Sequence, residues 1–161
     1  MLEDDCGVPV VITNNLRSAV TGFYSQQGKY KNIVFCSMPR GFRLGGLAVL
    51  MDGKVVSGAH NISGEIHFID ERNLDGRYNF LDPDEVLQVL AQEVLYSVAV
   101  VDPEVVYVRN ELNPDMEKLR EELTKNIPTK YIPELVHISE SEFQELILLG
   151  QMMLTLKEIE K

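Results

Sequence analysis

Two spacings of apolar residues alternate along the chain and predict an ordered series of strands and helices. Short aliphatic and β-branched runs predict strands at residues 8–12, 32–38, 44–51, 54–58, 104–108 and 134–138. Apolar residues three and four positions apart predict helices at residues 16–27, 83–101, 116–123 and 140–161. The first half therefore contains a strand, a helix and a strand pair, and the second half alternates helices with strands. This order is typical of an α/β fold with a mixed sheet flanked by helices.

Capping and turn residues support these boundaries. Asn15 is the expected N-cap of the first helix, and Gly28 follows its last turn. Asp82-Pro83 provides an N-cap and a proline at the first helical position, which favours a helix start there. Asp102-Pro103 ends the same helix, because a residue before proline avoids the helical conformation. Asp52-Gly53 predicts a type I′ hairpin turn.

Length and composition favour one globular domain. The chain has 161 residues, of which 45% are apolar and 25% are charged. No apolar run reaches the roughly 18–20 residues of a membrane span, and the acidic residues 3–5 do not resemble the start of a signal peptide. Cys6 and Cys36 are far apart and show no metal-ligand spacing. We therefore expect a cytoplasmic protein with no membrane association, no structural disulfide and no zinc site.

The negative charge is concentrated in the second half. Residues 1–80 hold eight acidic and eight basic side chains, whereas residues 81–161 hold seventeen acidic and seven basic ones. The net charge of −10 therefore lies entirely in residues 81–161. Affinity for nucleic acid depends largely on Lys and Arg side chains that neutralise phosphates. We therefore do not expect this chain to bind DNA by itself.

Polar residues gather at the start of the first predicted helix and form the first candidate site. Thr13, Asn14 and Asn15 follow a predicted strand and precede a helix. Ligands of open α/β sheets bind at the carboxyl ends of strands, so these side chains are candidate ligand contacts. The simpler alternative is a helix cap with an Asx turn.

A second candidate site is the polar loop at residues 58–67. The loop contains His60 between Gly58 and Gly64, and Glu65 and His67 after Gly64. A carboxylate next to an imidazole suits either sugar hydroxyls or a metal ion. A structural zinc ion usually takes four nitrogen or sulfur ligands, so this set is one ligand short. A solvated surface loop remains the alternative.

Other clusters favour structural roles. The turn at residues 39–46 is rich in glycine and contains two arginines, but neither a P-loop lysine nor a helix follows it, so a corner between strands is expected. Serine, cysteine and histidine residues show no nucleophile-elbow pattern. His137 lies in the last predicted strand and is expected to be a satisfied core or edge histidine.

Six segments in order resemble a known family. They are 8–19, 31–35, 52–59, 63–67, 101–106 and 149–153. Together they make the sequence similar to the C-terminal lobe of ROK proteins (repressors, open reading frames and sugar kinases), over nearly the whole chain. The resemblance implies an actin-like, ribonuclease-H-like fold for a single domain at residues 1–161, without the family's N-terminal lobe and winged helix. We therefore expect this chain to be a piece of a longer protein; the alternative is that the N-terminal lobe was lost.

The resemblance also implies a sugar site. Asn14 occupies the position of the family's sugar-contacting asparagine, and Glu65 that of the glutamate that holds sugar hydroxyls. His67 matches the family histidine only if one residue is deleted before it. Asn15, His60 and His67 complete the expected ligand-binding set. No catalytic residue, metal ligand or cofactor is expected.

Three departures from the family affect catalysis, the ATP site and a zinc motif. The family's catalytic aspartate is replaced by Asn15, and an amide cannot accept the proton of an attacking hydroxyl. The family's phosphate-binding glycine turn is replaced by the segment 39–43, and its adenosine-side glycine pair by Arg109-Asn110. The family's zinc-binding cysteines are absent, since Cys36 is the last cysteine of the sequence.

These observations favour a sugar-sensing and dimerising lobe of a ROK-like transcriptional regulator that is not an enzyme. Its expected partners are a monosaccharide and a second copy of the chain, with DNA contacted only through an N-terminal domain outside it. The first alternative is a divergent ATP-dependent sugar kinase lobe with another base, such as Glu65. The second is a lobe that only dimerises, through the helix at 82–101 and the C-terminal helix.

Overall fold

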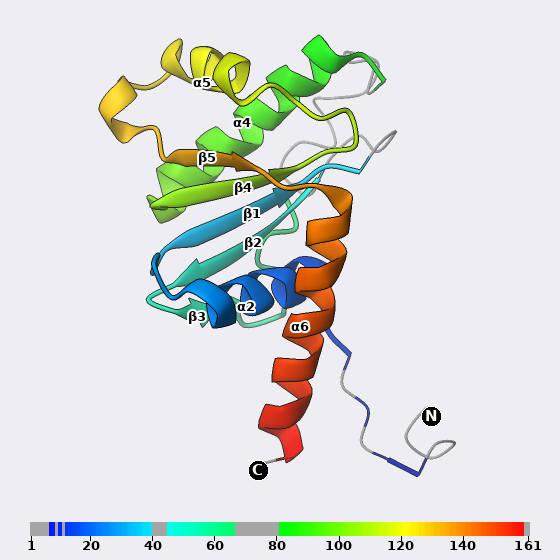
Figure 1. The fold of residues 1–161 in the computed structure, drawn as a ribbon. Coiled ribbons are helices and arrows are strands. Elements are labelled where there is room, and N and C mark those ends of the chain that lie inside the picture. The colour runs from blue at the N-terminus through cyan, green and yellow to red at the C-terminus, as the bar shows by residue number, and fades with distance from the viewer. Residues whose placement is uncertain (1–6, 9, 11, 40–44, 67–80, 160–161) are drawn as a thin grey trace.

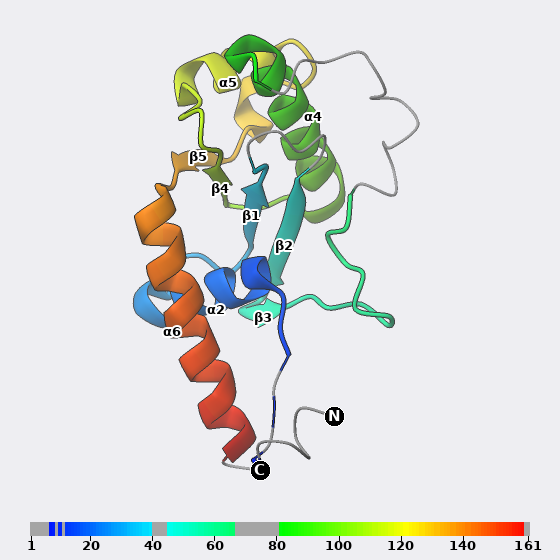
Figure 2. The same cartoon turned by 90° about the vertical axis from the view of Figure 1, so that its right-hand side faces the viewer.

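The computed structural model describes residues 7–8, 10, 12–39, 45–66 and 81–159. A five-stranded mixed sheet lies between two pairs of helices (Figures 1 and 2). The strands have the order β3-β2-β1-β4-β5, with β1 antiparallel to β2 and parallel to β4. The strands are β1 (Ile33–Ser37), β2 (Gly46–Met51), β3 (Lys54–Val55), β4 (Val105–Arg109) and β5 (Glu134–His137). The helices are α2 (Asn15–Gln27), α4 (Pro83–Val101), α5 (Met116–Thr124) and α6 (Glu140–Ile159), with a short 3₁₀ turn at Thr129–Tyr131.

Both faces of the sheet are buried. On one face Val34 and Val106 pack against α4 and α5. On the other face Phe35 and Tyr107 stack with their ring centroids 5.0 Å apart and contact Phe23 of α2. Burial on both faces explains why β1 and β4 are almost wholly apolar.

The α/β fold and most predicted element boundaries are confirmed. The side chain of Asp82 caps α4, and α4 ends at Val101 as expected. The Asp52-Gly53 turn joins β2 to β3 with both residues at positive φ, 49° and 74°. The predicted return strand is shorter than expected, because only Lys54 and Val55 pair with β2.

Two details of the N-terminal region were predicted wrongly. Helix α2 begins at Asn15, and its N-cap is Asn14 rather than Asn15. The expected strand at 8–12 is not formed by the described residues Gly7, Val8, Val10 and Ile12. Ile12 is 86% exposed, and the strand order, with β3 and β5 at its edges, includes no strand from the described residues of this segment.

Helices α2 and α6 cross at very short range because small residues face each other. A Cβ atom on Gly150 of α6 would lie 1.8 Å from the carbonyl oxygen of Ser18. A Cβ atom on Gly22 of α2 would lie 2.2 Å from the carbonyl oxygen of Leu146. Glycine is therefore required at both positions, and this crossing fixes where the start of α2 lies relative to α6.

No helix among the described residues is long and apolar enough to cross a membrane.

Candidate functional site

Asn14 begins the candidate site at the N-terminus of α2. Its backbone is extended, with φ −77° and ψ 138°, and its side-chain Oδ1 accepts hydrogen bonds from the backbone N–H groups of Leu16 at 2.9 Å and Arg17 at 3.3 Å. The capping alternative is therefore correct for Asn14. The side chain is exposed, and its amide nitrogen is not used by the cap. Asn15 is also exposed, in the first turn of the helix.

Arg17 joins this helix start to the polar loop that follows β3. Its Nη2 donates to the backbone carbonyl oxygens of Asn61 at 2.8 Å, Ser63 at 3.1 Å and Ser57 at 3.5 Å. Sequence reasoning missed this residue, because backbone carbonyl groups leave no mark in the sequence. The one available signal was its spacing: residues three apart share a helix face, which places Arg17 beside Asn14.

The loop at 56–66 has a backbone that depends on glycine. Gly64 has φ +91°, its carbonyl oxygen accepts the N–H of Leu47 at 2.9 Å, and a Cβ atom there would lie 1.9 Å from the carbonyl oxygen of Leu47. Gly58 also has a positive φ, of 74°. The loop is thus fastened to β2 at Gly64 and to α2 through Arg17. Its two predicted ligand residues differ in exposure, since Glu65 is half-buried and His60 is exposed.

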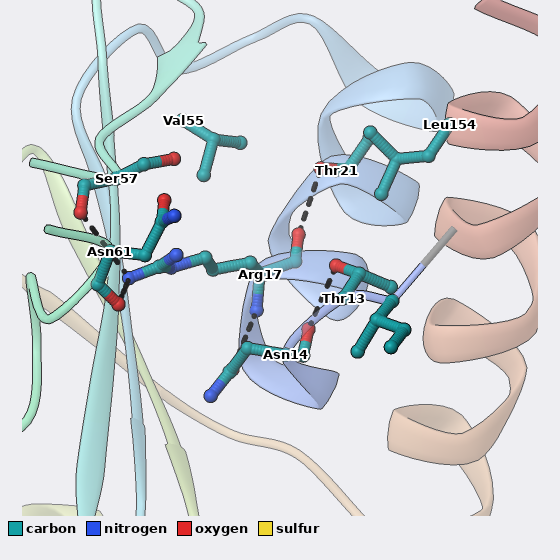
Figure 3. A pocket seen from close by; sticks show the side chains of 9 residues that line it. Thr13, Asn14, Arg17, Thr21, Val55, Ser57, Asn61 and Leu154 are labelled. Carbon is teal, nitrogen blue, oxygen red and sulfur yellow. Dashed lines mark hydrogen bonds between the residues drawn. The ribbon is translucent and has the colours of Figure 1, made fainter. Parts of the chain in front are cut away.

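A cavity of about 560 Å³ lies between the start of α2, this loop and the C-terminal half of α6 (Figure 3). Asn14, Arg17, Ser57 and Asn61 contribute polar groups to its wall, and Leu154 contributes an apolar one. Of the predicted site residues in the described part of the chain, Asn14 lines the cavity, whereas Asn15, His60 and Glu65 are not among the lining residues. His60 precedes the lining residue Asn61 directly. His67 lies outside the described residues.

A second polar cluster closes the carboxyl ends of the parallel strands β1 and β4. The guanidinium of Arg109 donates to Ser37 Oγ at 3.0 Å and to Glu140 of α6, at 2.7 Å from Nε. It also stacks over the ring of Phe143 at 4.8 Å. Hydrogen bonds from Gln144 and from Arg109 lower the pKa of Glu140.

Asn110 completes this closure. Its side chain is buried and donates from Nδ2 to the carbonyl oxygen of Met38 at 2.7 Å, while its Oδ1 accepts the N–H of Leu112 at 2.8 Å. The Arg109-Asn110 pair therefore binds the end of β4 to the end of β1 through side chains.

A buried carboxyl group lies on the opposite face of the sheet. Glu93 of α4 is 1% exposed and accepts hydrogen bonds from the thiol of Cys36 at 3.0 Å and from the N–H of Gly45 at 2.9 Å. Burial is the larger cause, and the neighbouring Glu93 carboxyl the smaller one, that raises the pKa of Cys36 well above its ordinary value. Such a thiol is a poor nucleophile, and Glu93 serves to hold the start of β2.

His137 differs from its prediction. It lies on the edge strand β5 as expected, but its Nε2 is buried without a hydrogen-bond partner, so it is not a satisfied histidine. Within the described ranges no group of three or more His, Cys, Asp or Glu side chains is placed to hold a metal ion. The turn at 40–44 lies outside those ranges.

The chain is similar in structure, and only weakly in sequence, to ROK proteins. No family model and no curated protein matches its sequence. The Lmo2764 protein from Listeria monocytogenes has a TM-score of 0.69 and 13% identity, over 98% of this chain and 69% of its own. A ROK family glucokinase from Streptomyces griseus in complex with glucose and AMPPNP has a TM-score of 0.59 and 15% identity, over 92% of this chain and 69% of its own.

A ROK family transcriptional regulator, a homolog of the E. coli MLC protein, has a TM-score of 0.61 and 16% identity, over 93% of this chain and 54% of its own. Kinases and a regulator therefore resemble the chain to a similar degree, and likeness at this level shows the fold alone. The chain has the actin-like fold of the ROK proteins and sugar kinases.

Proposed function

We propose that this chain is the sugar-sensing and dimerising lobe of a cytoplasmic, ROK-like transcriptional regulator that does not transfer phosphate. Because kinases and a regulator share the fold, the proposal depends on the side chains at two places. One is the closure between β1 and β4, where a nucleotide would have to lie. The other is the cavity at the start of α2, where a sugar would bind.

The observation that carries the proposal is the position of Arg109. Ligands of open α/β sheets bind beyond the carboxyl ends of the strands. The family resemblance assigns this place to backbone that lies close to the adenosine. Here the Arg109 side chain, only 12% exposed, occupies it and is bound to Ser37 and Glu140. A nucleotide could enter only if these charge-assisted hydrogen bonds were broken, and each such bond typically contributes more than a neutral one.

Asn15 supports the same conclusion for the chemical step. A kinase needs a group that accepts the proton of the attacking sugar hydroxyl. The resemblance places the family's aspartate at Asn15, in the first turn of α2. An amide has no basic lone pair of that strength, so general-base catalysis is lost at this position.

The cavity at the start of α2 supports sugar binding. Its wall combines amide, hydroxyl and apolar groups, a mixture that suits the polar edges and apolar faces of a sugar ring. Asn14 contributes from the helix, and the loop that carries His60 and Glu65 is held in place by Arg17. In a regulator, a sugar bound here would favour the conformation for which it has the higher affinity, and so shift the population of the DNA-binding state.

Calorimetry on the full-length protein tests the proposal. We expect a monosaccharide to bind, ATP not to bind, and no sugar phosphate to form when both are present. Asn15→Asp should not restore turnover, because Arg109 still fills the nucleotide position. Tight ATP binding together with sugar phosphorylation by the unmodified protein would contradict the proposal.

The alternative is a divergent ATP-dependent sugar kinase lobe. It is favoured by the structural likeness to a glucokinase in complex with glucose and AMPPNP. In that case Glu65, which lies half-buried in the loop beside the cavity, would supply the base. A coupled kinase assay distinguishes the two functions: turnover that the double variant N14A/E65Q abolishes would establish the kinase.

Dimerisation is best supported on α6. Four large apolar side chains recur on one face of this helix and are more than half exposed: Leu148, Met152, Leu156 and Ile159. The apolar residues of α4, by contrast, are mostly buried in the core of this same chain. A second copy of the chain would therefore be expected to pack on α6 and not on α4.

A further inference from the structure

Arg17 is the one charged group among the described residues that line the cavity at the start of α2. The other polar groups of the wall are the hydroxyls of Thr13, Thr21 and Ser57 and the amides of Asn14 and Asn61. Figure 3 shows the Arg17 side chain extending from α2 towards the loop at Ser57 and Asn61. The cavity therefore has a positive wall in a protein whose net charge is −10.

The guanidinium uses only part of its hydrogen-bonding capacity. An arginine side chain carries five N–H donors in a planar fork. All three hydrogen bonds of Arg17 start from Nη2 and end on neutral backbone carbonyl oxygens. Nε and Nη1 donate to no residue in the described part of the chain, and no carboxylate there neutralises the charge. The residues that the structure describes therefore leave three donors and the positive charge of Arg17 at the cavity wall.

Arg109 shows how the same side chain behaves when its charge is neutralised. Its Nε and Nη2 bind the carboxylate of Glu140, and Nη1 binds Ser37. Arg17 has its Nη2 held by the loop, which fixes the orientation of the planar group. Both two-donor edges of a guanidinium include Nη2, so Nε and Nη1 remain as separate donors for an anion. A single donor of a charged guanidinium forms a charge-assisted hydrogen bond with an oxygen of a phosphate or a carboxylate.

We propose that the ligand of this cavity is an anionic sugar, and that Arg17 binds its acid group. The inference rests on the proposed sugar-binding function and narrows it to a sugar that carries a phosphate or a carboxylate. Asn14 and the hydroxyl groups of the wall bind the sugar hydroxyls, and Arg17 selects against neutral sugars.

Titration calorimetry on the full-length protein tests this inference with matched ligands. The probes are glucose, mannose, galactose and N-acetylglucosamine, each as the neutral sugar and as its 6-phosphate, together with the uronic acids of the three hexoses. We expect an anionic member of one series to bind about 10- to 100-fold more tightly than its neutral parent, as one charge-assisted hydrogen bond provides. The phosphate and uronate arms identify which acid group the site takes.

Arg17→Gln should remove this preference, and Arg17→Lys should keep part of it, because lysine retains the charge but not the planar group that the loop orients. Arg120→Gln is the matched control: it removes the same charge from α5, on the opposite face of the sheet, and should change nothing. Equal affinity for neutral and anionic sugars would overturn the inference and leave the proposed function intact. If Arg17→Gln weakened the binding of neutral and anionic sugars equally, the inference would also be overturned, and Arg17 would be a positioning residue for the loop. If no sugar of either kind binds, the proposed function itself fails.

Discussion

Replacement of Gly150 by alanine should destabilise the protein, although alanine is the better helix former. A Cβ atom at this position would lie 1.8 Å from the carbonyl oxygen of Ser18 and 2.6 Å from its carbon, whereas ordinary contact begins near 3.4 Å. The clashing atoms belong to the backbone of α2, so the rotation of a side chain cannot relieve the clash. The two helices must therefore move apart by more than an ångström along a crossing that also contains Gly22.

Two opposing contributions set the size of the change in the free energy of unfolding. Alanine in place of glycine within a helix contributes about 1 kcal/mol of stability. Overpacking of a core typically costs about 1–3 kcal/mol, and the upper value applies here because backbone meets backbone. The net effect is a loss of about 2 kcal/mol, which corresponds to a fall of roughly 4–8 °C in the melting temperature of a domain of this size.

Urea and thermal unfolding measure this loss. Glu145→Ala, at an exposed position of the same helix, serves as the control and should stay within about 0.5 kcal/mol of the parent protein. Leu154, one turn after Gly150, lines the cavity, so the variant should also bind sugar more weakly. An increase of about 1 kcal/mol in stability for Gly150→Ala would refute the steric reasoning, because only helix propensity would then remain.

Three further predictions follow from single contacts. His137→Leu should raise the free energy of unfolding by about 1 kcal/mol in urea titrations, because the substitution removes the buried, unpartnered Nε2; a loss of stability would indicate that Nε2 has a partner in solution. Hydrogen bonds from Gln144 and then from Arg109 lower the pKa of Glu140, which adds stability at pH values above the ordinary pKa of 4.5 that is lost as the pH falls through the lowered pKa. Arg109→Met should therefore remove part of the pH dependence of the urea midpoint below about pH 4.5, and an unchanged profile would contradict the role of Arg109. Met152→Lys should convert a dimer to a monomer in light scattering, because Met152 is 63% exposed on α6 and the lysine would place a charge in the contact between two copies. A parent protein that is already monomeric would contradict dimerisation through α6.

The layered fold could be predicted because its signals are local. Asp82-Pro83 and Asp102-Pro103 each fix backbone conformation within two or three residues, and α4 begins and ends there. The almost wholly apolar strands β1 and β4 are typical of strands that are buried on both faces of a sheet. Two neighbouring asparagines could both cap a helix, and only the extended backbone of Asn14 decides between them. The run at 8–12 has strand-forming residues, but a strand also needs a partner edge, which no local pattern reports.

The candidate site was predicted less completely for a similar reason. Asn14 could be placed near the site because it lies at the start of a helix. Arg17 could not be identified, since its partners are backbone oxygens 40 to 46 residues away along the chain. Arg109 was expected to fill space near the strand ends, but its binding to Glu140 depends on where α6 starts after β5.

The two arginines lie at separate places in the fold and, under the proposed function, have opposite effects on binding. Arg109 is neutralised by a carboxylate and fills the place beyond the parallel strands where the family resemblance would put a nucleotide. Arg17 is fixed by carbonyl groups and leaves its charge beside the cavity at the start of α2. Because none of the hydrogen bonds of Arg17 ends on a residue that Arg109 contacts, loss of nucleotide binding does not require loss of sugar binding. Under the proposed function, this lobe would therefore lack phosphoryl transfer because of Asn15 and Arg109 and would still bind a sugar in the cavity at the start of α2.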